Sequence, residues 1–115
     1  MNQTLPLLIG NIGLNLKFDH AQLEHVIAHR YSMFVRASDP GYPINICWQK
    51  TPDDPEQMDV EIKFTRGRID VMSSGYSGVI LVDREADLNI KSANPIGGID
   101  YFLRVVIAEL AFQAG

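Results

Sequence analysis

The closing stretch of the chain, residues 94–115, constrains the fold most, because it predicts a long helix that is apolar on two sides. Asn94 is a favourable N-cap residue, and Pro95 is tolerated in a first helical turn. The first apolar stripe has the spacing of an ordinary core face. Its members are Ile96, Ile99, Leu103, Val106, Ile107 and Leu110. We expect this stripe to cover the domain's own sheet.

A second apolar stripe lies roughly on the opposite side of the same helix, counted at about 100° per residue. It consists of Tyr101, Val105, Ala108 and Phe112. Asp100, Arg104 and Ala111 separate the two stripes on one flank, and Glu109 and Gln113 separate them on the other. Because the sheet needs only one stripe, the second predicts a protein interface. The sequence therefore predicts a small domain that binds a partner.

Alternating apolar and polar residues predict strands before this helix. The pattern is clearest over residues 12–18, 44–49, 60–65, 69–72 and 88–91. We interpret residues 73–78 as a turn and residues 79–82, apolar on both faces, as a central strand or one covered on both sides. Gly10-Asn11 marks either a tight turn or a bulge. The prediction is a single α+β domain over residues 1–115, a two-layer sandwich whose mainly antiparallel sheet has about five to six strands, with two helices on one face.

The first helix is expected to begin after Asp19, which together with Gln22 forms a capping-box pattern. We expect it to run to about Phe34. Its predicted buried face consists of Leu23, Val26, Ile27, Tyr31 and Phe34. Arg30 lies near the middle of that face, so its stem should pack while the guanidinium reaches the rim or the last carbonyls.

Composition excludes several classes of protein. The net charge of −4 and the lack of a face that interleaves basic and aromatic residues argue against a nucleic-acid partner. Cys47 is the only cysteine, so an intrachain disulfide is excluded, as suits a reducing compartment. Charges interrupt the closing helix, and the N-terminus has no signal-peptide pattern. We therefore expect a cytoplasmic protein without a membrane partner.

Few residues suggest chemistry. His25 and His29 are four apart and could share a metal, but no third ligand is near them in sequence, so a solvated face is the favoured explanation. Cys47 has no neighbouring base that would activate a nucleophile. The acids Asp83, Glu85 and Asp87 lie in or beside a predicted turn, where acids are common. We therefore expect no catalytic residue, no metal and no cofactor.

Two glycine-bearing segments could be mistaken for phosphate loops. Residues 73–78 join two strands, and residues 96–98 open the closing helix. Neither is followed by the Lys-Ser/Thr pair with which a P-loop holds phosphate and magnesium. We therefore expect the chain not to bind ATP.

Several segments resemble a known family. They are Asp59-Val60-Glu61-Ile62-Lys63-Phe64, Arg68-Ile69-Asp70-Val71, Gly75-Tyr76-Ser77-Gly78, Ser92-Ala93-Asn94-Pro95 and Tyr101-Phe102-Leu103-Arg104-Val105. They resemble the N-terminal region of bacterial proteins related to HPr serine kinase/phosphorylase, which include kinase-like ATPases from peptide-modification gene clusters. In that family a strand-rich module ends in such a helix, and a P-loop domain follows. This chain has no Gly-x-x-x-x-Gly-Lys-Ser/Thr motif, so no catalytic residue of the family has a counterpart here.

The resemblance implies a non-catalytic accessory domain that packs on an HPr-kinase-like catalytic domain, in cis or in trans, and helps to position it or its substrate. The chain is then either part of a longer protein or a stand-alone relative. The alternative is a stand-alone small protein that self-associates, or that binds a peptide through an open sheet edge or the closing helix. A third interpretation, a metal- or ligand-dependent enzyme, rests only on His25, His29 and Cys47.

Overall fold

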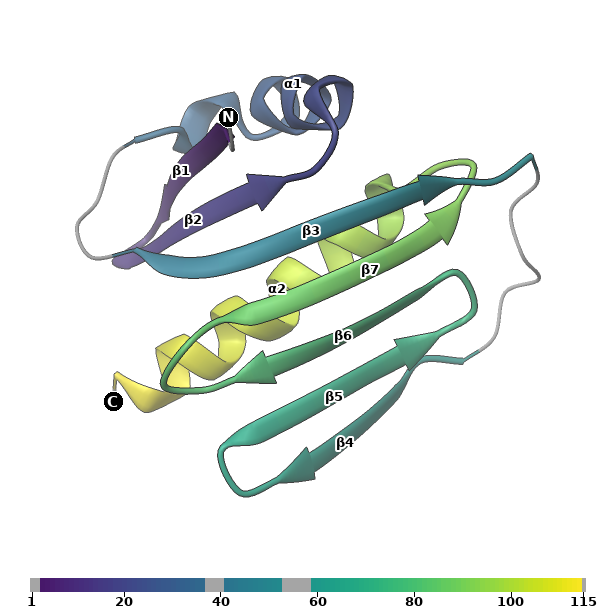
Figure 1. Cartoon of the computed structure of the whole chain (residues 1–115). Coiled ribbons are helices and arrows are strands. Elements are labelled where there is room, and N and C mark those ends of the chain that lie inside the picture. The colour runs from purple at the N-terminus through teal and green to yellow at the C-terminus, as the bar shows by residue number, and fades with distance from the viewer. Residues whose placement is uncertain (1–2, 37–40, 53–58, 115) are drawn as a thin grey trace.

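A single seven-stranded sheet with two α-helices makes up the computed structural model, which describes residues 3–36, 41–52 and 59–114 (Figure 1). Its elements in chain order are β1 (Gln3–Ile9), β2 (Ile12–Phe18), α1 (Ala21–Arg30), a short 3₁₀ helix (Ser32–Phe34), β3 (Tyr42–Lys50), β4 (Glu61–Thr65), β5 (Arg68–Ser73), β6 (Tyr76–Leu81), β7 (Ala86–Ser92) and α2 (Ile96–Gln113). The strand order is β1-β2-β3-β7-β6-β5-β4. The predicted α+β class is confirmed.

The sheet is mixed, with seven strands, so the expected antiparallel sheet of five to six strands is only roughly right. β3 runs parallel to both β2 and β7, whereas the other neighbouring strands are antiparallel. The crossover through α1 brings the chain back in the direction of β2, which makes β2 and β3 parallel. The chain then builds the β4–β5–β6 meander before β7 returns to the free side of β3 (Figure 1).

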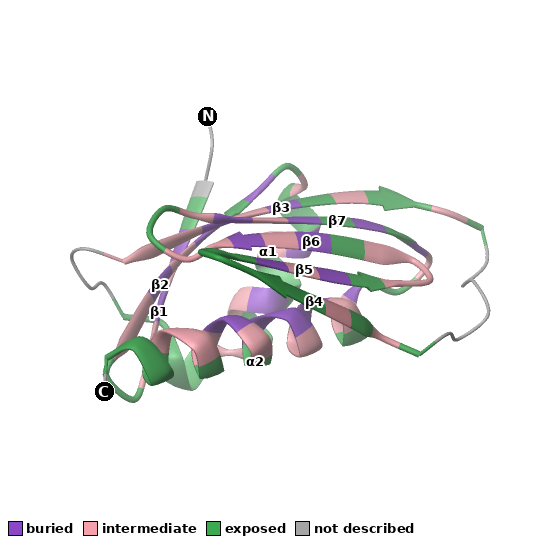
Figure 2. Cartoon of the chain, turned by 90° about the horizontal axis from the view of Figure 1, so that it is seen from below, coloured by how far each residue is buried: buried purple, intermediate pink, exposed green. Residues whose placement is uncertain are grey.

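Both helices pack on the same face of the sheet, as predicted. Alternate residues of the strands point to this face, and with the helices they form one apolar core (Figure 2). The fully buried members include Leu14, Ile44, Ile80, Leu88 and Phe102. The opposite face of the sheet has no helix on it among the described residues (Figures 1 and 2). The structure is therefore two-layered, with one open sheet face.

The sheet-facing side of α2 agrees with the predicted stripe and includes one further residue. Ile99, Leu103 and Val106 are buried, as expected, while Ile96, Ile107 and Leu110 are partly buried against the core. Phe102, assigned to neither stripe, is completely buried. Its ring lies over Gly78 of β6, where a Cβ atom would be only 2.2 Å from the ring carbon Cε1. Gly78 therefore leaves the space that the ring fills.

Four local predictions about helix and strand bounds were wrong. The first helix ends at Arg30, four residues early, because the chain turns there through the 3₁₀ helix so that Val35 can pair with β1. The cap of α1 is His20, whose Nδ1 accepts from the Leu23 amide at 3.4 Å. Similarly, α2 begins at Ile96 with Pro95 as its cap, although the Asn94 side chain does accept from the Ile96 amide at 3.2 Å. Residues 76–78, predicted as a turn, belong to β6.

The buried face of α1 is narrower than predicted. Leu23 and Ile27 are buried, and Tyr31 is partly buried, but Val26 is 47% exposed and Phe34 37% exposed. The helix packs on β1 and β2 at the end of the sheet, so only the stripe formed by Leu23 and Ile27 is fully covered. β6 is a central strand, between β7 and β5, but it is covered on one face only, since Val79 and Leu81 line the open face. At Gly10 a φ of 61° makes a tight hairpin turn between β1 and β2.

Candidate interaction surface

One edge of the sheet is protected by its own chain. Pro6 lies within the edge strand β1, and proline at a sheet edge is a common device against further pairing. Val35 forms a bridge with Leu7, and the Arg36 amide donates to the Pro6 carbonyl oxygen at 3.2 Å. The segment that follows the 3₁₀ helix therefore covers the middle of this edge, at Pro6 and Leu7.

The other edge, formed by β4, is open. β4 pairs with β5 on one side, and no described residue pairs with its other side (Figure 1). Ile62 and Phe64 lie opposite the buried residues Val71 and Ile69, so they point to the helix side of the sheet. α2 packs chiefly over β2, β6 and β7. Val60 and Ile62 are partly buried against the core, whereas Phe64 is 68% exposed. We call Val60, Ile62 and Phe64 the β4 shelf.

The predicted interface stripe of α2 lies on the side of the helix that is turned away from α1. Gly98 on this side contacts the ring of Tyr76 in β6, which shows that this flank points toward the β6–β5–β4 end of the sheet. Tyr101 and Val105 are partly buried against the core, Ala108 is exposed, and Phe112 is 81% exposed. The stripe and the β4 shelf both lie on the helix side of the sheet, where α2 runs (Figure 2), and toward its β4 end; we call this region the corner.

The opposite flank of α2 is joined to α1 by a polar contact. The Arg30 guanidinium forms an ion pair with Asp100, with Nε donating to Oδ1 at 3.1 Å, and the Tyr31 hydroxyl donates to the same carboxylate. Burial by itself would raise the pKa of Asp100, but the hydrogen bonds from Arg30 and Tyr31 lower it overall. Burial, and then the neighbouring carboxylate, raise the pKa of Tyr31 to about 12. Arg30 thus reaches across to α2 instead of the last carbonyls of its own helix.

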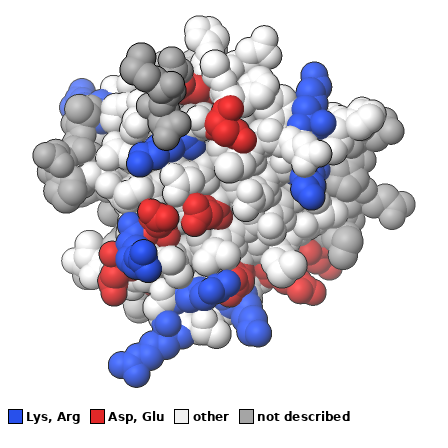
Figure 3. All heavy atoms as spheres, in the orientation of Figure 1, with Lys and Arg blue, Asp and Glu red and all other residues white. Residues whose placement is uncertain are grey.

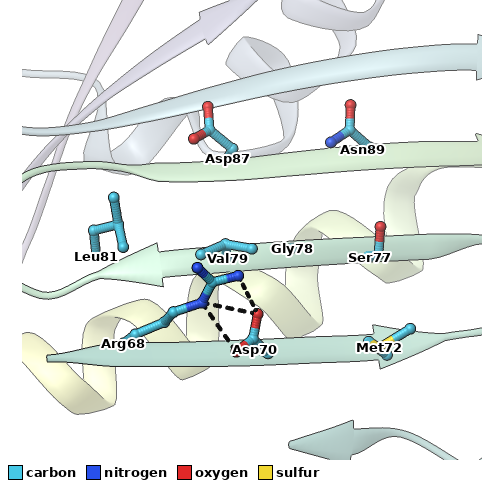
Figure 4. Close-up of a pocket in the computed structure, with 9 residues that line it drawn as sticks. All are labelled: Arg68, Asp70, Met72, Ser77, Gly78, Val79, Leu81, Asp87 and Asn89. Atoms are coloured by element: carbon cyan, nitrogen blue, oxygen red, sulfur yellow. Dashed lines mark hydrogen bonds and ion pairs between the residues drawn. The ribbon is translucent and has the colours of Figure 1, made fainter. Parts of the chain in front are cut away.

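The open face of the sheet carries polar side chains that are already paired. In Figure 3, basic and acidic side chains are interspersed across this face. Nine residues of β5, β6 and β7 line a shallow hollow of about 280 Å³ (Figure 4). Within it, the Arg68 guanidinium donates to both carboxylate oxygens of Asp70, at 3.0 to 3.2 Å. Asn45 donates to Asp87 at 3.0 Å.

The other candidates from the sequence are scattered. His25 and His29 are both exposed on α1, and the described residues contain no group of three or more metal-binding side chains. Cys47 is exposed on the open face, where its residual burial and then the nearby Asp19 and Asp87 raise the pKa of its thiol. A raised pKa disfavours the reactive thiolate. By contrast, Asp83, Glu85 and Asp87 gather near Tyr42: burial, and then these three carboxylates, raise the pKa of its hydroxyl to about 12.

Both glycine-bearing segments have structural explanations. Ser74-Gly75 is the two-residue turn between β5 and β6, with Gly75 at a φ of 92°. Gly97 and Gly98 lie in the first turn of α2, where Gly98 accommodates the ring of Tyr76. The open β4 edge is not predicted by the sequence. The alternation of apolar residues with Glu61 and Lys63 indicates a strand, but it does not indicate that this strand lies at an edge or that Phe64 stays exposed.

Comparisons with protein families, curated proteins and solved structures find no match to this chain. The resemblance to HPr kinase-related proteins therefore stays a prediction. Among the described residues, neither helix has the length and apolar character needed to cross a membrane.

Proposed function

We propose that this chain is a non-catalytic interaction domain that docks on a partner through the α2 stripe and the β4 shelf. The observation that carries the proposal is the exposure of Phe112 and Phe64, two large apolar side chains exposed at 81% and 68% at this corner. Large apolar side chains left exposed on one side of a molecule commonly mark an interaction site. The partly buried Tyr101 and Val105 continue this surface toward the core.

The resemblance to HPr kinase-related proteins suggests what the partner is. We propose an HPr-kinase-like catalytic domain, in cis or in trans, which this domain helps to position relative to its substrate. The chain supplies no phosphate-binding motif of its own, so catalysis belongs to the partner. We place this function in the cytoplasm, because a single cysteine suits a reducing compartment, and we assign it no cofactor, nucleic acid or membrane.

The test is a double variant at the two exposed positions of the stripe, Ala108→Lys with Phe112→Ser. Both side chains are exposed, so the free energy of unfolding should change by no more than about 0.5 kcal/mol. Calorimetric titration with an isolated HPr kinase-related catalytic domain should show binding that is weaker by roughly tenfold or more, since interface anchors usually cost over 1 kcal/mol.

Ala111→Lys is the matched control, because Ala111 is also exposed but lies on the other flank of α2. It adds the same charge to the same helix and should bind like the wild type. If the wild type, the double variant and Ala111→Lys bound the catalytic domain with equal affinity, the assigned surface would be contradicted. An unaltered chain that bound neither the catalytic domain nor itself would contradict the function.

A further inference from the structure

We propose that two copies of this chain join edge to edge through β4, antiparallel to each other, with Ile62 on the two-fold axis. The inference rests on the proposed function, since it names a second copy as a partner at the same corner. Four observations carry it: the asymmetry of the two sheet edges, the direction of the main-chain groups of β4, the order of its charges, and its exposed apolar face.

The two edges of the sheet differ in their readiness to pair. The β1 edge carries Pro6 and is covered by Val35 and Arg36. The β4 edge contains no proline, and no described residue covers it. An unpaired and uncovered edge strand is a ready template for another strand. β4 is therefore the edge at which a second sheet can be added.

The hairpin between β4 and β5 determines which main-chain groups of β4 point outward. Its two-residue turn closes on the pair of Thr65 and Arg68. In an antiparallel ladder, hydrogen-bonded and non-hydrogen-bonded pairs alternate, so Thr65 and Lys63 bond toward β5. The N–H and C=O groups of Phe64 and Ile62 then point away from the sheet. Only registers in which these residues bond to the second copy are compatible with this geometry.

Charge selects one of these registers. Glu61 and Lys63 point to the open face, on either side of Ile62. With Ile62 opposite its own copy, Glu61 of each chain lies opposite Lys63 of the other, in non-hydrogen-bonded pairs where side chains are closest. Centring the contact on Lys63 instead would place two lysines opposite each other. Like charges directly opposite are destabilising. The register centred on Ile62 is therefore favoured.

The apolar face agrees with the same register. The shelf of each copy points to the helix side, and Phe64 of one copy lies opposite Val60 of the other. The two shelves thus form one apolar strip in the middle of a continuous sheet. Because α2 packs chiefly over β2, β6 and β7, the helix of each copy lies to one side of this strip. Pairing also satisfies the outward main-chain groups of the edge.

The experiment is charge complementation between two single variants, followed by sedimentation velocity over a range of concentrations. Glu61→Lys leaves lysines at positions 61 and 63, and Lys63→Glu leaves glutamates at these two positions. Each variant alone should dimerise roughly tenfold more weakly than the wild type, because two attractive cross-strand pairs become repulsive. An equal mixture of the two should form a heterodimer of nearly wild-type affinity, since both of its cross-strand pairs are again of opposite charge.

A thermal melt of each variant serves as the folding control, because Lys63 also lies opposite Asp70 of β5. The mixture distinguishes dimerisation weakened by like charges from dimerisation weakened by a damaged fold, since a damaged fold would not recover on mixing. A wild-type chain that stays monomeric at every concentration would overturn the proposal. So would single variants that dimerise as well as the wild type, which would place self-association elsewhere. Neither result contradicts docking through α2, which the Ala108 and Phe112 variant tests separately.

Discussion

At the scale of single residues, the position of α2 depends on the close contact between Gly78 and Phe102. The ring is completely buried, and it occupies the space that any side chain at Gly78 would need. We predict that Gly78→Ala destabilises the domain by about 1–3 kcal/mol, as overpacking of a core commonly does. Urea denaturation measures this change. The ring cannot move away easily, because it is wedged between the helix and the sheet.

Gly97→Ala provides the contrast for this prediction. A Cβ atom at Gly97 would meet nothing within 4 Å, and the residue lies in the first turn of α2. Alanine should therefore be neutral there or stabilise by up to about 1 kcal/mol, through its better helix propensity. If both alanine variants lost the same stability, the specific contact with Phe102 would not be the cause.

Part of this contact could be predicted from the sequence. Phe102 lies three residues after Ile99 and four before Val106, which is the spacing of a buried stripe. A glycine within an apolar strand pattern also suggests a close approach of another group. The second glycine at Gly75 made residues 73–78 resemble one long turn, and this obscured the first three residues of β6. Which ring would fill the gap depends on the tertiary packing of α2 over β6.

At the scale of elements, the two helices are held together by the contact of Asp100 with Arg30 and Tyr31. The pKa of Asp100 is lowered in the folded protein, so its ionised form is stabilised there. This contribution is fully present above the unfolded pKa, near 4, and is lost as the pH falls through the lower folded pKa. We predict that Asp100→Asn melts at a lower temperature than the wild type at pH 6, and that this difference disappears at acid pH.

Tyr31→Phe sharpens this test. The variant removes one hydrogen bond to the carboxylate and should raise the folded pKa of Asp100 toward its ordinary value. The acid loss of stability should then be smaller, and it should be complete at a higher pH than in the wild type. Thermal melts between pH 2 and pH 6 measure both effects. If the melting temperatures of the wild type and the Asp100→Asn variant differed by the same amount at every pH, this account of the ion pair would be contradicted.

The sequence predicted which segments are helices better than it predicted where they end. The core stripe of α2 follows from its spacing, because the helix is long and one side must cover the sheet. α1 was predicted too long, since the apolar residues Tyr31 and Phe34 continue the helical spacing beyond Arg30. Whether a chain continues a helix or turns to cover a sheet edge depends on contacts far away in sequence. Val35 pairs with Leu7, and no local pattern indicates this bridge.

At the scale of the whole molecule, the fold class could be predicted but the order of strands could not. Alternation shows that each strand buries one face, and it does not show which strand lies beside it. The pairing of β3 with β7 joins segments separated by the whole meander, and this pairing makes the sheet mixed. The open β4 edge follows from the same order. The predicted stripe of α2 and this edge border one corner, which the sequence alone could not bring together.

The central claim is that the chain attaches to its partner at this corner, and residue-resolved hydrogen exchange at β4 tests it most directly. The amides of Ile62 and Phe64 point outward, whereas that of Lys63 bonds to β5 in either state. We predict that exchange at Ile62 and Phe64 slows as the concentration of the chain rises, or when an HPr-kinase-like catalytic domain is added, while Lys63 changes little. Exchange at Ile62 and Phe64 that stays equally fast under both conditions would contradict the claim.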